Sequence, residues 1–109
     1  MITPGDVVTL PFPGVRDVKR RPAVVVSSTD FHQTRTDVIA ALLTSQLREE
    51  TAPTDYLLAD WAAAGLRRPS LFRVFLTTQP ASVVTVIGHL SERDWREVQA
   101  RLHLGLAIA

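Results

Sequence analysis

Cysteine is absent from the 109 residues of this chain, and aromatic side chains make up only 6% of it. Without cysteine the chain can form neither a disulfide framework nor a zinc–thiolate site. Long apolar runs are also lacking, since none approaches the roughly 20 residues of a membrane-spanning helix. Pro4, Gly5 and Asp6 interrupt the first residues, which have no basic start, so we expect no secretory signal. These absences predict a cytoplasmic protein without a membrane partner.

An excess of one charge is missing as well, because 12 lysine and arginine residues face 11 aspartate and glutamate residues. The net charge of +1 does not by itself indicate a nucleic-acid partner. The cations are nevertheless clustered in two stretches, namely Arg16, Lys19, Arg20 and Arg21, then Arg67, Arg68 and Arg73. With 46% hydrophobic and 21% charged residues the composition is globular, and the length predicts one domain over residues 1–109.

Short β-rich segments recur along the chain with no long helix between them. Apolar and β-branched runs predict strands at 7–10, 23–26, 38–43, 56–58, 71–77 and 83–90. The polar connection over 27–36 is long for an ordinary loop, so it is either functional or locally folded. This order predicts a mainly β fold, a small antiparallel barrel or strongly bent sheet with a C-terminal α-helix.

Helix signals are clearest near the C-terminus. Ser91 is a good N-cap, and Asp94 stands three residues later, where a capping box has its acidic partner. Gly105 is placed to stop this helix. A single helical turn is predicted earlier, with Asp60 as its N-cap and Gly65 just past its end.

Three adjacent cations, Lys19, Arg20 and Arg21, precede Pro22 and the apolar run 23–26. Proline is tolerated at the first position of a strand, so the cations are expected at a strand entry. Like charges in a row repel one another, and such a cluster is favoured where a phosphate must be held. A solvated loop surface is the alternative explanation for the same residues.

Several ordered motifs are similar to those of the MazF/PemK family of bacterial toxin endoribonucleases. The most specific is Arg21-Pro22-Ala23-Val24-Val25-Val26-Ser27, which resembles the family's Arg-Pro-Ala, three apolar residues and Ser. The others are Gly5-Asp6-Val7-Val8, Phe12-Pro13, Thr44-Ser45-Gln46, Gly65-Leu66, Ser70 and Ile87-Gly88-His89-Leu90-Ser91. Each is weak alone, but the ordered set spans nearly the whole chain.

The resemblance implies an SH3-like β-barrel with a C-terminal helix, usually a homodimer. It implies cleavage of single-stranded RNA without a metal or other cofactor, and neutralisation by a cognate antitoxin. Carried over by motif, Arg21 would be the catalytic arginine and Thr44 the threonine that works beside it. The chemistry is reasonable, because a guanidinium presents a planar fork of donors to the phosphoryl oxygens on which negative charge develops.

The remaining candidates have weaker support. RNA contacts are expected for Arg16, Lys19, Arg20, Ser45 and Gln46, although the last two are equally typical of a hydrogen-bonded turn. His32 could act as an acid or base near neutral pH, or be an inert loop histidine. One departure from the family stands out, since some members have an acidic residue, assigned as general base, where this chain has Phe75.

Two other functions therefore stay open. A catalytically weak or inactive RNA-binding homologue would accommodate Phe75. A topoisomerase poison of the related CcdB type would use the same barrel without chemistry, although that function depends on C-terminal helix residues rather than on the Arg-Pro and Thr-Ser-Gln motifs.

Overall fold

The computed structural model describes residues 1–13, 18–47 and 51–108. Its strands form one sheet in the order β4-β5-β3-β2-β1-β6, and the pairs between neighbours are antiparallel. The elements in chain order are β1 (Asp6–Pro13), β2 (Val18–Val25), α1 (Thr29–Thr34), β3 (Asp37–Thr44), β4 (Tyr56–Leu57), β5 (Leu71–Pro80), a 3₁₀ turn (Ala81–Val83), β6 (Thr85–His89) and α2 (Glu92–Gly105).

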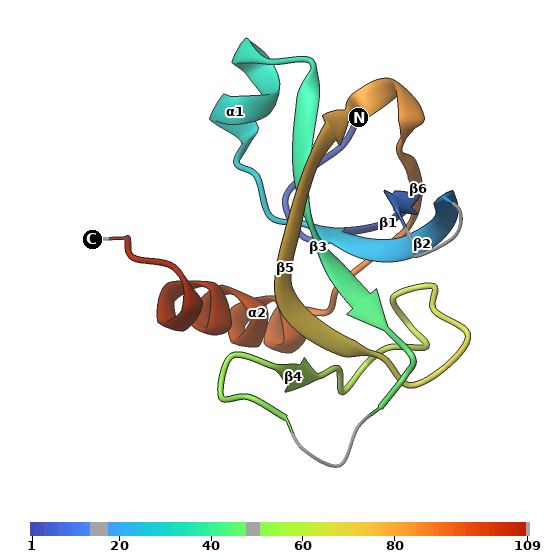
Figure 1. The fold of residues 1–109 in the computed structure, drawn as a ribbon, viewed down its shortest axis with the longest axis vertical. Coiled ribbons are helices and arrows are strands. Elements are labelled where there is room, and N and C mark those ends of the chain that lie inside the picture. Colours follow the sequence, from blue (N-terminus) through green and yellow to red (C-terminus); the bar gives the residue numbers. More distant parts are fainter. Residues whose placement is uncertain (14–17, 48–50, 109) are drawn as a thin grey trace.

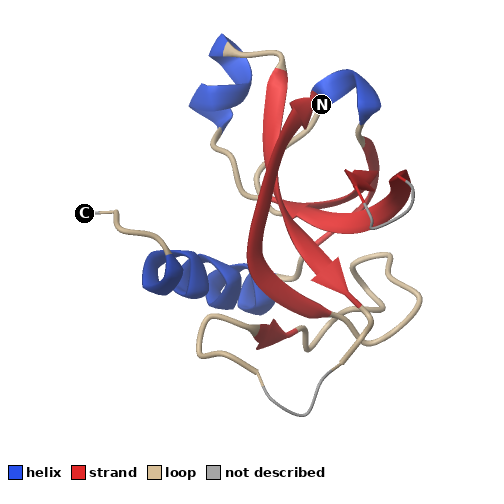
Figure 2. Cartoon of the chain, viewed as in Figure 1, coloured by secondary structure: helices blue, strands red, loops and turns tan. Residues whose placement is uncertain are grey.

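The sheet is strongly curled, with β3 and β5 running side by side while β2, β1 and β6 turn away from them (Figures 1 and 2). The helix α2 packs below this curl, against β5 and β4. The mainly β fold with a C-terminal helix is therefore confirmed. Within the described parts of the chain, the structure contains no helix that is long and apolar enough to cross a membrane.

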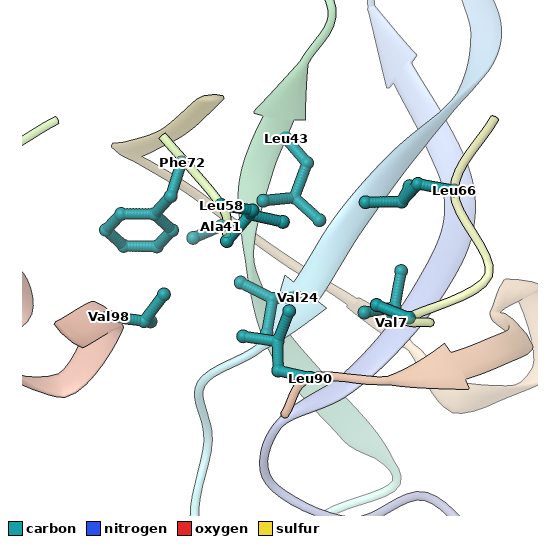
Figure 3. Close-up of a cluster of buried hydrophobic side chains, with 10 residues drawn as sticks. Val7, Val24, Ala41, Leu43, Leu58, Leu66, Phe72, Leu90 and Val98 are labelled. Atoms are coloured by element: carbon teal, nitrogen blue, oxygen red, sulfur yellow. The ribbon is translucent and has the colours of Figure 1, made fainter. Parts of the chain in front are cut away.

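Alternation along the strands gives the sheet two buried faces. The face toward α2, here called the helix face, gathers ten buried residues: Val7, Val24, Ala41, Leu43, Leu58, Ala64, Leu66, Phe72, Leu90 and Val98 (Figure 3). The opposite face carries a second, smaller cluster: Val8, Leu10, Phe12, Ala23, Val25 and Ala40. Two consecutive residues of a strand therefore point their side chains to opposite faces of the sheet, one into each cluster.

Some elements begin or end at other residues than the sequence predicts, because their backbone hydrogen bonds continue into residues whose composition is not typical of a strand or helix. The strand predicted at 23–26 begins at Val18, so Pro22 lies inside β2 rather than at its start. The polar connection is locally folded, because Ser28 caps the short helix α1. Gly65, at φ +89°, ends a hydrogen-bonded turn over residues 60–66 and not a regular helical turn. At that backbone conformation glycine is favoured over other residues.

The N-terminus of α2 confirms one capping prediction and corrects another. Ser91 is the N-cap, and its Oγ accepts a hydrogen bond from the backbone N–H of Asp94. Asp94 does not complete a capping box, because its fully buried carboxylate binds elsewhere. It accepts from Tyr56 Oη at 2.6 Å and from the backbone N–H groups of Ala59 at 3.0 Å and Asp60 at 2.8 Å. A long-range contact has replaced the local one.

Asp60 is likewise used by α2 and not as the predicted cap of its own turn. Its carboxylate accepts from Ser91 Oγ at 2.6 Å and from Arg93 Nε and Nη2, each at 2.7 Å. The hydrogen bonds from Arg93 and then from Ser91 lower the pKa of Asp60 to about 2. Burial, followed by the hydrogen bond to Asp94, raises the pKa of Tyr56 to about 12. Together these bonds clamp the segment 56–60 to the start of α2.

Candidate functional site

Arg21 and Thr44 lie just beyond the last residue pair between β2 and β3. The last pair between β2 and β3 is Ala23 with Leu42. Each lies two residues beyond this pair, so an antiparallel register extended past the pair would bring Arg21 opposite Thr44. By alternation both belong with Ala23 and Leu42 on the face opposite α2. The two residues assigned to catalysis by resemblance therefore lie at the same end of the β2–β3 pairing, although 22 residues lie between them in the sequence.

Pro22 explains why the sheet opens at this point. It still pairs with Thr9 of β1, but it lies one residue beyond the last pair between β2 and β3. Since proline has no N–H to donate to a ladder, ending the pairing here leaves no hydrogen bond unmade on its account. Arg21 is exposed and Thr44 half-buried at the resulting strand end.

A cavity of about 370 Å³, here called the Thr44 cavity, lies beside this end. Its described lining is mostly polar and comprises Thr44, Gln46, Thr51, Ala52, Asp55, Leu71 and Arg73. Thr44 Oγ1 accepts the backbone N–H of Gln46 at 3.1 Å, so that bond does not use its own hydroxyl proton. Asp55 supplies the carboxylate of this lining; it accepts from Ala52 N at 2.9 Å and lies 3.8 Å from Arg73 Nε.

A second cavity, of about 350 Å³ and here called the Ser45 cavity, is lined by the residue that follows Thr44 in the chain. Its described lining joins five polar residues to apolar walls: Thr9, Ser45, Arg67, Arg68 and Ser70, with Pro22, Gly65, Leu66 and Ile87. Thr44 and Ser45 are consecutive, so their side chains diverge toward different cavities. The predicted residues Ser45 and Gln46 are both exposed, and each lines one of the two cavities.

The basic residues before Pro22 differ in how they are held. Arg20 is exposed, but its Nη2 donates to Thr9 O at 2.7 Å and to the hydroxyls of Thr9 and Thr85, each at 3.2 Å. Arg20 therefore ties β2 to β1 and β6 with one nitrogen. Lys19 is exposed on β2 opposite Phe12. The predicted RNA contact of Arg16 lies outside the described residues.

His32 is not brought to the Arg21–Thr44 end. It lies in α1, which connects the far ends of β2 and β3 (Figure 1). Its Nε2 is 2.5 Å from Oγ of Ser27, a buried residue whose hydroxyl also accepts from Ile39 N at 3.0 Å. These contacts explain the histidine as an anchor of α1. Within one chain, the structure separates it from the two residues with which it was predicted to act.

Phe75, at the position where some relatives have an acid, is 54% exposed on β5. Its ring packs on buried Phe12, with centroids 6.0 Å apart and planes inclined by 56°. No carboxylate therefore occupies this position, and the carboxylate that does line the Thr44 cavity comes from Asp55 in a different segment.

The arrangement defines a small curled β protein whose open strand end presents guanidinium and hydroxyl groups, a combination suited to a phosphate-bearing ligand. Residues 3–106 match the family described as PemK-like, MazF-like toxins of type II toxin–antitoxin systems. The chain belongs to this family. No curated protein matches it.

Solved structures of similar fold cover nearly the whole chain. An endoribonuclease from a mycobacterial species, in complex with its cognate antitoxin, has a TM-score of 0.76 at 19% identity and full coverage of both chains. A MazE–MazF structure from Deinococcus radiodurans has a TM-score of 0.74 at 18% identity, covering 99% of this chain and 97% of that one. The Mycobacterium tuberculosis toxin MazF-mt6 has a TM-score of 0.72 at 19% identity, covering 89% and 91%.

Sequence reasoning did not assign roles to Asp55 or to the Arg67–Arg68 pair. For Arg67 and Arg68, the clustering of arginines in the sequence could have indicated a functional role. Nothing in the sequence places them beside Ser45, because that contact depends on how the turn over 60–66 folds back against β6. Asp55 belongs to a charged turn by sequence, and only the cavity connects it with Thr44.

Proposed function

We propose that this protein is the toxin of a type II toxin–antitoxin pair and acts as a sequence-selective endoribonuclease on single-stranded RNA, without a metal ion. The proposal is supported by the position of Arg21 and Thr44, both two residues beyond the last β2–β3 pair, in a chain that belongs to the PemK-like, MazF-like toxins. Cleavage follows from what these two groups can do to a phosphodiester.

In the proposed reaction the 2′-oxygen of a ribose attacks the adjacent phosphorus. The O2′–P bond forms while the P–O5′ bond breaks, which leaves a 2′,3′-cyclic phosphate and a 5′-hydroxyl. The 2′-hydroxyl gives up one proton, and the departing 5′-oxygen takes one from solvent water. Arg21 donates to the phosphoryl oxygens as their negative charge grows, and Thr44 uses its hydroxyl proton in the same way.

Asp55 is the group that we propose as acceptor of the 2′-hydroxyl proton. Among the described residues that line the Thr44 cavity, it supplies the only carboxylate. Its place in this cavity would compensate for Phe75, which stands where some family members have an acid. Its contact with Arg73 holds the carboxylate in position, and the bond from Ala52 N fixes one oxygen and leaves the other toward the arginine.

The test is cleavage of a long single-stranded RNA in the presence of EDTA by wild-type protein beside Arg21→Ala. We expect discrete cuts by the wild type and a loss of about 10²- to 10³-fold in the variant, the scale of removing one preorganised donor. Arg96→Ala is the matched control, because it removes an exposed arginine on α2 that pairs only loosely, at 3.9 Å, with Glu92. Wild-type activity in Arg21→Ala would refute the assignment.

A second variant tests the acceptor separately. Asp55→Asn keeps the shape and the oxygen that accepts Ala52 N, but it cannot take a proton. We expect the rate to fall while the affinity for RNA stays within a few fold. An unchanged rate would assign proton transfer to solvent and remove Asp55 from the reaction.

We also propose a cognate antitoxin and a homodimer as partners. The antitoxin is proposed because the mycobacterial and Deinococcus structures of similar fold contain antitoxins. The homodimer is proposed because apolar side chains on β5 and β6 are exposed, among them Phe75, which is 54% exposed, and Val86, which is 45% exposed. Sedimentation of the purified chain tests the homodimer, and a monomer at micromolar concentration would refute it.

A further inference from the structure

The Ser45 cavity has the composition of a nucleotide site rather than that of a structural gap. Pro22, Leu66 and Ile87 provide apolar walls, while hydroxyl groups and two arginines provide polar ones. Single-stranded RNA is bound through unstacked bases laid on such surfaces, with base edges reaching hydrogen-bonding groups and phosphates reaching arginine. We infer that the Ser45 cavity binds the nucleotide next to the scissile phosphate, an inference that rests on the proposed function.

The location supports this inference. Pro22 follows Arg21 directly, and Ser45 follows Thr44. Consecutive Cα atoms are about 3.8 Å apart, so the cavity begins within one residue of each proposed catalytic group. Alternation directs Ser45 away from the Thr44 cavity, so the two cavities lie on either side of the end of β3. A strand of RNA crossing this end can occupy both.

The two arginines are presented by a turn that is held in place by its own hydrogen bonds. Leu66 N donates to Trp61 O at 3.2 Å, and Ser70 Oγ donates to Arg68 O at 2.9 Å. Gly65 lets the chain reverse at φ +89° and approach the backbone of Ile87. The turn therefore sets Arg67 and Arg68 beside the cavity before any ligand arrives.

Charge distinguishes this cavity from a third one, which lies beside α2. The α2 cavity contains three arginines, but each has an acidic partner: Arg93 pairs with Asp60, Arg101 with Glu97 and, more loosely, Arg96 with Glu92. None of the ion pairs found among the described residues involves Arg67 or Arg68. Their positive charge is thus available to a phosphate, whereas the α2 cavity is already neutralised.

Binding is tested with a short single-stranded RNA that contains a mapped cut site and has 2′-deoxyribose at the cut nucleotide, so that it cannot be cleaved. We expect the double variant Arg67→Ala/Arg68→Ala to bind this RNA at least tenfold more weakly by fluorescence anisotropy. The slope of log K against log salt should become shallower by about 0.7 for each phosphate that the variant no longer neutralises. Arg96→Ala, which removes one positive charge from α2, should bind like the wild type.

Specificity is tested with Ser45→Ala, which removes a hydroxyl from the cavity without changing charge. Sequencing of the ends produced from a long RNA should reveal a preference weakened about three- to tenfold at one nucleotide flanking the cut, the scale of one hydrogen bond. The other positions of the recognition sequence should keep their preference.

The outcomes separate this inference from the function on which it rests. If the wild type neither binds nor cuts RNA, the proposed function fails and the subsite fails with it. If the wild type cuts while both sets of cavity variants match it in affinity, salt slope and cut sites, the subsite alone is overturned. An equal loss in Arg96→Ala would also overturn it, because the effect would then be one of total charge.

Discussion

Replacing Asp94 by alanine should destabilise the fold more than any other single change at the start of α2. The carboxylate is completely buried and accepts three hydrogen bonds, from Tyr56 Oη and from the backbone N–H groups of Ala59 and Asp60. Leaving one such donor without an acceptor costs about 1 to 3 kcal/mol. Because Tyr56 and Asp60 are only partly buried, water can satisfy some of them, so the low end applies and the expected loss is about 3 kcal/mol.

Urea unfolding followed by circular dichroism measures this loss. With a slope of about 1 to 1.5 kcal/mol/M, 3 kcal/mol lowers the midpoint by about 2 to 3 M, a large share of the stability of a small domain. Glu92→Ala is the matched control: it removes a carboxylate from the same helical turn whose side chain is 88% exposed. Its expected loss is below about 1 kcal/mol, since it affects only the helix dipole and a surface ion pair.

Two further variants measure how much each hydrogen bond of Asp94 contributes to the free energy of unfolding. Tyr56→Phe removes one of the three donors and should cost about 1 kcal/mol. Asp94→Asn keeps one carbonyl oxygen for Tyr56 and Ala59 but turns an amide NH₂ toward Asp60 N, so its loss should lie between those of Tyr56→Phe and Asp94→Ala. If Asp94→Ala were no less stable than Glu92→Ala, the reasoning that a buried acceptor clamps residues 56–60 to α2 would be refuted.

The remaining predictions concern other contacts. Gly88→Ala should unfold at a lower temperature than the wild type, because the added Cβ would collide with the carbonyl of Ala64; an unchanged melting temperature would mean that this turn shifts freely. His32→Ala should cut RNA in EDTA as fast as the wild type, since the structure holds this histidine away from the strand end, and a loss of rate without a loss of folding would contradict that separation. Asp60 has a folded-state pKa of about 2, below its ordinary 3.8, so its ion pair with Arg93 stabilises the fold above about pH 4 and stops doing so as the pH falls toward 2. Thermal unfolding between pH 5 and 2 should therefore show a steeper loss in the wild type than in Arg93→Ala, and parallel curves would argue against the pair.

Local signals in the sequence predicted the type of several helices and strands correctly, but they did not predict the hydrogen-bond partners of the side chains at their ends. The strand 38–43 and the helix after Ser91 were correct in kind because hydrophobic periodicity and an N-cap act within a few residues. The roles of Asp60 and Asp94 were wrong because both are good local caps, yet each carboxylate gains stronger, less solvated partners across the fold. A capping rule cannot anticipate this, since those partners are about 30 to 40 positions away in the sequence.

Residue types in a fixed order were enough to predict the fold class and the family, and they named Arg21 and Thr44 as the candidate catalytic pair. Only the tertiary structure decided which groups share a surface. Strand pairing places Arg21 and Thr44 at the same end of the β2–β3 ladder, and Ser45 lines a different cavity from Thr44. Long-range packing places Asp55 beside one cavity and Arg67 and Arg68 beside the other. The physical reason is that a side chain's direction follows from strand pairing, which closes between segments that no local pattern connects.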